Sequence, residues 1–306
     1  MLRSRRHAGR TQRRGARARV ATALVAALVA VLALALSLPG DSGGTGSKSR
    51  LRLVFDQEFR GHALDGRIWR TCFWWATTTC SIETNHELEL YTRGNVSVGG
   101  GALTLRAQRH PMVGWNGKTF AYTSGMVMSD PRGARRGFAF KYGRAEARIK
   151  VPRGAGLLPA FWLLPAGGAS RPEIDVTEIL GSSPRVDSMH IHHAGPSGRT
   201  VAVGHDWTGP DFSAGWHTFA VDWEPHAIVW SVDGVVRWRV TNPAAIPRRP
   251  MYLLLTLAVG GDFPGSPTRS TVFPSDLRVA SVRVWQRRYA VRPLPPMYSK
   301  IDAAPR

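Results

Sequence analysis

Three carboxylates, Glu173, Asp175 and Glu178, lie within six residues near the middle of the chain, among apolar and β-branched residues. This composition is typical of a β-strand. Side chains two apart on a strand share a face, so Glu173 and Asp175 point the same way. Glu178 would point to the opposite face unless a β-bulge near Val176 or Thr177 adds one residue. With that bulge, the three carboxylates suit hydrolysis of a glycosidic bond by a carboxylate nucleophile and a protonated acid.

Two other interpretations fit the same spacing. Acidic residues that alternate along a strand often form its solvated face. Glu and Asp oxygens are also ligands that hard cations prefer. The flanking sequence has to decide between these interpretations and catalysis.

The elements that must position these carboxylates are short strands and turns from Leu51 onward, with no long segment of helical period. Residues 102–107, 142–151 and 281–286 alternate between apolar and polar side chains, as half-buried strands do. Residues 228–240 predict a hairpin with Asp233-Gly234 at its turn. We expect residues 51–290 to form one all-β domain, an antiparallel β-sandwich with a concave face for a long polymer.

The first 50 residues differ from this body. Residues 1–19 are rich in Arg and lack acids, and residues 20–38 carry no charge. This pattern predicts export from the cytoplasm, with residues 1–40 acting as a signal peptide or as an uncleaved signal anchor. We expect residues 41–50 to be a flexible linker and residues 291–306 to be a Pro-rich tail. The protein would then be extracellular and touch a membrane only through its N-terminal segment.

The distribution of charge argues against nucleic-acid binding. The formal net charge is +20, but ten of the 41 Lys and Arg residues lie in the first 50 residues. The remaining basic residues are scattered, and no nucleic-acid-binding motif surrounds them, so we do not expect DNA or RNA as a partner.

Cys72 and Cys80 predict a local disulfide, since the domain would fold in an oxidising compartment. We expect a monomer.

The flanking motifs resemble glycoside hydrolase family 16, the laminarinase-like β-jelly-roll enzymes, over nearly the whole body. Six segments match in the family's order: Phe55–Phe59, Asn85–Thr92, Tyr122–Gly125, Tyr142–Lys150, Leu158–Pro165 and Leu257–Gly261. The acidic segment has the family pattern Glu-x-Asp-x-x-Glu. The resemblance implies a β-jelly roll with Glu173 as nucleophile, Glu178 as general acid/base and Asp175 as their auxiliary.

The resemblance also implies an endo-acting hydrolase of β-1,3-glucan such as laminarin, which retains anomeric configuration by double displacement and needs no cofactor. Three alternatives stay open: action on another β-linked polysaccharide such as mixed-linkage glucan or galactan, transglycosylation, and glucan binding without catalysis. Two positions depart from the family pattern, Met126 and Thr256. Because we expect both to face the cleft, the preferred glucan is left undecided.

Five further side chains are candidates for substrate binding. Trp162, His190 and Asn85 match family positions, whereas Trp74 and Trp115 lie in loops that could form subsite walls. The full set is Trp162, His190, Asn85, Trp74 and Trp115.

Two metal sites were considered. His190 and His192 alternate onto one face of a strand, which suits zinc, but the sequence places no acidic partner beside them. The family resemblance implies a structural calcium on the convex face. Glu58 is its remaining side-chain ligand, because Ala280 stands where the family commonly has Asp. We therefore regard calcium at Glu58 as doubtful.

Overall fold

The computed structural model describes residues 51–77, 79–132 and 136–287. The predicted signal or anchor, the linker and the Pro-rich tail lie outside the described residues. Within the described part of the chain, no helix is long and apolar enough to cross a membrane.

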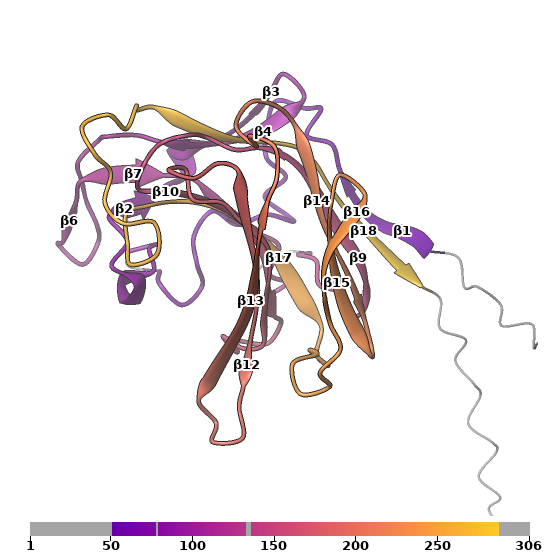
Figure 1. Cartoon of the computed structure of the whole chain (residues 1–306). Coiled ribbons are helices and arrows are strands. Elements are labelled where there is room, and N and C mark those ends of the chain that lie inside the picture. Colours follow the sequence, from indigo (N-terminus) through magenta and orange to yellow (C-terminus); the bar gives the residue numbers. More distant parts are fainter. Residues whose placement is uncertain (1–50, 78, 133–135, 288–306) are drawn as a thin grey trace, which may run out of the picture. The chain divides into compact units, whose positions relative to one another are not determined.

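Two antiparallel sheets make up most of the domain (Figure 1). The larger sheet has the order β16-β15-β14-β9-β18-β4-β3, and β1 also pairs with β18. Its strands are β1 (Leu51–Gln57), β3 (Val96–Gly99), β4 (Ala102–Ala107), β9 (Gly143–Lys150), β14 (His217–Glu224), β15 (Ala227–Val232), β16 (Val235–Val240) and β18 (Ser275–Arg287). The smaller sheet has the order β13-β12-β11-β10-β17-β8. Its strands are β8 (Met126–Met128), β10 (Leu157–Pro165), β11 (Glu173–Glu178), β12 (Val186–Ala194), β13 (Thr200–Thr208) and β17 (Met251–Val259).

The remaining elements are short. β2 (Glu89–Tyr91) pairs in parallel with β7 (Tyr122–Ser124), and β5 (Met112–Val113) pairs with β6 (Thr119–Phe120). Among the described residues, helix is limited to the 3₁₀ turns η1 (Glu83–Asn85) and η2 (Arg93–Asn95). The prediction of an all-β antiparallel sandwich is confirmed.

Hydrophobic patterning explains why the two sheets pack face to face. In β9, Ala145, Ala147 and Ile149 are buried in the core, and the residues between them are polar and more exposed. This period of two is typical of a sheet with one solvated face. By contrast, all nine residues of β17 in the smaller sheet are buried, so both faces of this strand are largely shielded from solvent.

The predicted hairpin forms as β15 and β16. Asp233 and Gly234 occupy its turn with φ values of 50° and 79°. A type I′ turn needs positive φ at both central residues, which favours Asp-Gly. The hairpin places Trp230 in the core, completely buried, where its indole reaches the backbone of strand β11.

Candidate active site

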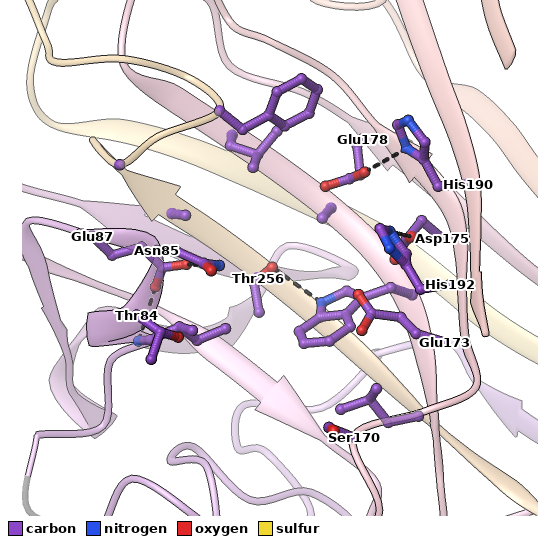
Figure 2. A pocket seen from close by; sticks show the side chains of 18 of the residues that line it. Thr84, Asn85, Glu87, Ser170, Glu173, Asp175, Glu178, His190, His192 and Thr256 are labelled. Carbon is purple, nitrogen blue, oxygen red and sulfur yellow. Dashed lines mark hydrogen bonds and ion pairs between the residues drawn. The ribbon is translucent and has the colours of Figure 1, made fainter. Parts of the chain in front are cut away.

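Strand β11 contains the bulge that the acidic spacing predicts. Along β12, Asp175 pairs with His190 and Glu178 pairs with Ser188, so three steps on β11 oppose two on β12. Along β10, Thr177 pairs with Phe161 and Asp175 pairs with Trp162, which leaves Val176 as the extra residue. The prediction of a bulge near Val176 or Thr177 is confirmed. Glu173, Asp175 and Glu178 consequently line the same pocket (Figure 2).

Two interactions behind β11 hold the bulge in place. Ile174 and Val176 are both buried in the main core, so consecutive acids are separated by apolar anchors. The indole Nε1 of Trp230 donates a hydrogen bond of 2.8 Å to the carbonyl oxygen of Asp175. This contact joins the larger sheet to β11, because Trp230 lies on β15. It also satisfies a buried carbonyl oxygen at the point where the strand ladder is irregular.

The pocket is a cleft of about 1000 Å³ over the smaller sheet. Besides the three acids, its walls include Trp74, Trp75, Asn85, Trp162 and Phe263. An open cleft with aromatic walls and a few convergent polar groups is typical of a ligand site.

Burial and nearby negative charge raise the pKa values of two of the carboxyl groups, those of Glu173 and Asp175. Burial raises the pKa of Glu173 well above its ordinary value, and the nearby Asp175 raises it further, while His192 opposes the shift. The pKa of Asp175 is also raised well above its ordinary value, first by burial and then by the charge of Glu178. Burial and the nearness of the two carboxyl groups thus both disfavour a second negative charge on the pair.

Each of two histidines lies beside one of the acids (Figure 2). His190 Nδ1 lies 2.9 Å from Glu178 Oε2, within hydrogen-bonding distance. His192 Nε2 lies 3.2 Å from Asp175 Oδ2, although that oxygen has no hydrogen bond of acceptable geometry. The sequence-based reason for setting zinc aside, that these histidines lack acidic partners, is thus wrong. The acidic partners lie on β11, the strand next to β12, and the register between the two strands brings them beside the histidines.

Gly204 makes room for His190. The two residues are paired across β12 and β13, and a Cβ atom on Gly204 would lie 2.2 Å from His190 Cδ2. No ordinary side chain fits there without moving the ring. The edge of His190 also faces Phe263, with ring centroids 6.3 Å apart. The imidazole is therefore enclosed in the orientation that brings Nδ1 to Glu178.

Trp162 lies in the floor of the cleft. Its side chain is 8% exposed, and its Nε1 donates a 3.2 Å hydrogen bond to Thr256 Oγ1. Thr256 also lines the cleft, as the sequence led us to expect. The same expectation for Met126 is wrong. From the adjoining strand β8 this residue pairs with Thr256, but it is completely buried in a second hydrophobic cluster with Phe73 and Tyr91 and does not line the cleft.

The other predicted binding residues divide into two groups. Asn85 and Trp74 line the cleft. Trp74 is fixed from behind by Arg132, 3.7 Å from its ring, and donates to Tyr252 Oη at 3.2 Å. Trp115 does not lie among the cleft-lining residues; it lies between β5 and β6 and is 90% exposed. A loop tryptophan cannot be assigned to a cleft without knowing where its hairpin projects.

The predicted disulfide between Cys72 and Cys80 is confirmed, with a Cα–Cα distance of 4.9 Å. It closes the loop that carries Trp74 and Trp75. Because both tryptophans line the cleft, the disulfide restrains one wall of the site.

A buried acid that the sequence did not single out lies beneath the bulge. Asp187 on β12 is completely buried, and its Oδ1 accepts a 2.6 Å hydrogen bond from Thr177 Oγ1. Burial raises the pKa of Asp187 to about 8. The carboxyl group is therefore protonated at neutral pH and can stay in the interior without a counter-charge.

The surroundings of Glu58 do not fit a calcium ion. Arg283 Nη2 donates to its Oε1 at 2.5 Å, and Arg60 pairs with its Oε2. Both carboxylate oxygens thus face guanidinium cations, and Ala280 supplies no side-chain oxygen. Arg283 also bonds Asp56 at 3.0 Å, so it balances both nearby acids.

Comparison with known proteins agrees with this geometry. The sequence profile described as "Glycosyl hydrolases family 16" matches residues 75–272. A beta-glucanase of Rhodothermus marinus is 32% identical over 228 residues, which cover 66% of this chain and 75% of that protein. The chain belongs to glycosyl hydrolases family 16.

Solved structures of similar sequence share the fold. The laminarinase catalytic domain of Thermotoga maritima has a TM-score of 0.68 and 29% identity, over 78% of this chain and 99% of that one. The endo-β-1,3-glucanase of Pyrococcus furiosus has a TM-score of 0.66 and 32% identity, over 79% of this chain and 96% of that one. These neighbours agree with the jelly-roll architecture that the motifs predict.

Some curated family 16 relatives are much longer. Glucan endo-1,3-beta-glucosidase A1 of Niallia circulans is 31% identical over 271 residues, covering 78% of this chain but 38% of that protein. Similarly, the chain spans 52% of the endo-1,3-1,4-beta-glycanase ExsH of Rhizobium meliloti.

Proposed function

We propose that this chain is an endo-acting, retaining hydrolase of β-1,3-linked glucan. The bulge at Val176 carries the proposal, because it brings Glu178 to the same cleft as Glu173 and Asp175. Retention is a property of the family, and the neighbours named as laminarinase and endo-β-1,3-glucanase support the choice of substrate.

In the first step, Glu173 attacks the anomeric carbon as a carboxylate while Glu178 donates its proton to the departing glycosidic oxygen. The bond to the leaving sugar breaks, and a covalent bond forms between the sugar and Glu173. Because the pKa values of both Glu173 and Asp175 are raised, Glu173 ionises for this attack more readily when Asp175 is protonated. His192 favours the same arrangement, since its charge lowers the pKa of Glu173.

In the second step, Glu178 acts as a base. It takes a proton from water, whose oxygen attacks the anomeric carbon and releases Glu173 as a carboxylate. Between the two steps Glu178 is negatively charged, and His190 Nδ1, 2.9 Å away, can donate a hydrogen bond to it. Hydrogen bonds to charged groups contribute about 1.5–3 kcal/mol, so this contact assists the form that follows proton donation.

The cleft binds the polymer through stacking and polar contacts. Trp162 lies in register with Asp175 on the neighbouring strand and offers an apolar surface beside the scissile bond. Trp74 and Asn85 also line the cleft and would hold neighbouring sugar units. A cleft open to solvent suits cleavage within a chain.

The test combines a substrate panel with two variants. Purified protein is incubated with laminarin, mixed-linkage glucan, agarose and carrageenan, and the products are mapped by size and by NMR of the new anomeric centre. We expect internal cleavage of laminarin with β-anomers formed first. Glu173→Gln should abolish cleavage, while Glu146→Gln, on the outer face of β9, should not. Undiminished turnover by Glu173→Gln would refute the assignment.

The same panel separates the alternatives. Preference for mixed-linkage glucan or a galactan would change the substrate and keep the mechanism. Products longer than the starting oligosaccharide would indicate transglycosylation. Binding without any release of reducing ends would indicate a glucan-binding protein.

Export, anchoring and a monomeric state are further parts of the proposal, resting on the sequence alone. N-terminal sequencing of the protein from medium and from membranes tests whether residues 1–40 are removed. Light scattering of the purified domain measures its mass.

A further inference from the structure

Two sets of metal-ligating side chains lie in the cleft and share Asp175. One set is Glu173, Asp175 and His192, and the other is Asp175, Glu178 and His190. In each set, one nitrogen or oxygen atom per residue lies within 4.8 Å of the others. The strand register produces both sets, because Glu173 pairs with His192 and Asp175 pairs with His190.

The two sets differ in how well their atoms are already satisfied. In the second set (Asp175, Glu178 and His190), His190 and Glu178 already form a hydrogen bond of 2.9 Å with each other. In the first set (Glu173, Asp175 and His192), His192 Nε2 lies beside Asp175 Oδ2, an oxygen without a hydrogen-bond partner among the described residues, although Asp175 is only 2% exposed. A buried polar atom without a partner is costly. This oxygen lies 3.2 Å from His192 Nε2, so a partner placed between the two would satisfy both.

A transition-metal ion suits that position. Zn²⁺ binds imidazole nitrogen and carboxylate oxygen at about 2.0–2.2 Å, which places two tetrahedral ligands about 3.3 Å apart. The separation of 3.2 Å between His192 Nε2 and Asp175 Oδ2 is close to this value. Three protein ligands in an open cleft leave the fourth position for water. A mixed nitrogen and oxygen set favours Zn²⁺ or Cu²⁺ over Ca²⁺ or Mg²⁺.

We propose that Glu173, Asp175 and His192 form a binding site for one divalent transition-metal ion, which blocks the cleft when it is bound. Asp175 belongs to both sets. An ion bound to the first set therefore uses a ligand that the second set needs, and the second set cannot bind another ion equally tightly. The binding itself does not depend on the proposed hydrolase activity. The block does, because the ion would occupy the carboxylate oxygens of the proposed nucleophile and prevent attack on the sugar.

Isothermal titration of the chelator-treated protein with zinc chloride tests the site without reference to activity. We expect about one ion per chain, with affinity falling more than tenfold in His192→Gln and in Glu173→Gln. His205→Gln is the matched control, because His205 lies on the adjacent strand β13 and belongs to neither set. It should bind zinc as the unchanged protein does. Thermal melts of each variant show whether it is folded.

Several outcomes would overturn the assignment. These are an absence of zinc binding, unchanged binding in folded His192→Gln and Glu173→Gln, and a loss that follows His190→Asn but not His192→Gln. A second measurement addresses the block: zinc should inhibit laminarin hydrolysis, and chelation should restore it. If the protein binds zinc but cleaves none of the substrates, the metal site stands and the proposed function fails. If it cleaves laminarin equally well with zinc bound, the block is refuted.

Discussion

Replacing Gly204 with alanine should slow catalysis although this residue does not line the cleft. The added Cβ would lie 2.2 Å from Cδ2 and 2.6 Å from Nε2 of His190. Heavy atoms do not approach so closely, so the imidazole must rotate or move away. Its Nδ1 then loses the 2.9 Å contact with Glu178, and the acid/base loses the partner that orients it.

The size of the effect follows from the lost hydrogen bond. A hydrogen bond to a charged group contributes about 1.5–3 kcal/mol. If that contribution is lost from the transition state, kcat falls by about 10- to 150-fold. KM should change less than kcat, because His190 is the one cleft-lining side chain that the added Cβ displaces.

The assay is steady-state hydrolysis of laminarin, with thermal melts as a check on folding. Gly99→Ala is the matched control, because a Cβ there meets nothing within 4 Å. Adding His190→Asn to Gly204→Ala should recover part of the rate, since asparagine is smaller and its amide can replace the Nδ1 donor. A folded Gly204→Ala variant with unchanged kcat would show that the contact between His190 and Glu178 does not assist catalysis.

Three further predictions concern the surroundings of the site. Trp230→Phe removes the hydrogen bond to the Asp175 carbonyl and should lower the free energy of unfolding by about 1–3 kcal/mol, measured in urea; an unchanged value would mean that the bulge does not need this bond. Burial raises the pKa of Asp187 in the folded protein to about 8. The protonated carboxyl group therefore contributes its full stabilisation of the fold below the pKa that Asp187 has in the unfolded chain, and this contribution is lost as pH rises through about 8. Relative to Asp187→Asn, the unchanged protein should therefore lose about 1.4 kcal/mol per pH unit between pH 5 and 7; parallel stability curves for the two proteins would contradict this. Arg60 and Arg283 form ion pairs with both carboxylate oxygens of Glu58. Adding calcium to the chelator-treated protein should therefore leave Tm unchanged. A rise in Tm that saturates with calcium concentration would refute this interpretation.

The sequence predicted the acidic strand and its bulge well, because both depend on local residue spacing. The spacing of Glu173, Asp175 and Glu178 required an irregular strand, and the bulge at Val176 provides it. The Asp233-Gly234 turn was also local, since its conformation depends on the residues themselves. Both predictions rest on periods and turn preferences that one segment carries alone.

Features that depend on contacts between strands were not predictable. The histidine alternation on β12 was visible, but its acidic partners depend on the register with β11. The link from Trp230 to Asp175 joins two sheets and has no signature in either segment. Trp115 and Met126 were misplaced for the same reason, because exposure of a loop or strand residue depends on what packs over it.

The bulge has a consequence for changes in chain length. Removing Val176 would leave Glu-Ile-Asp-Thr-Glu, in which every second residue is acidic. On a regular strand, these three carboxylates would still share one face without any bulge. The cleft could therefore keep its acids through a single-residue deletion, while the core would lose one apolar anchor between Asp175 and Glu178. A one-residue insertion would also return Glu178 to the face of Glu173 on a regular strand, since the two would then be six residues apart. However, their partners on β12, His192 and Ser188, are four residues apart. Only the deletion keeps that separation, so the strand should tolerate shortening better than lengthening.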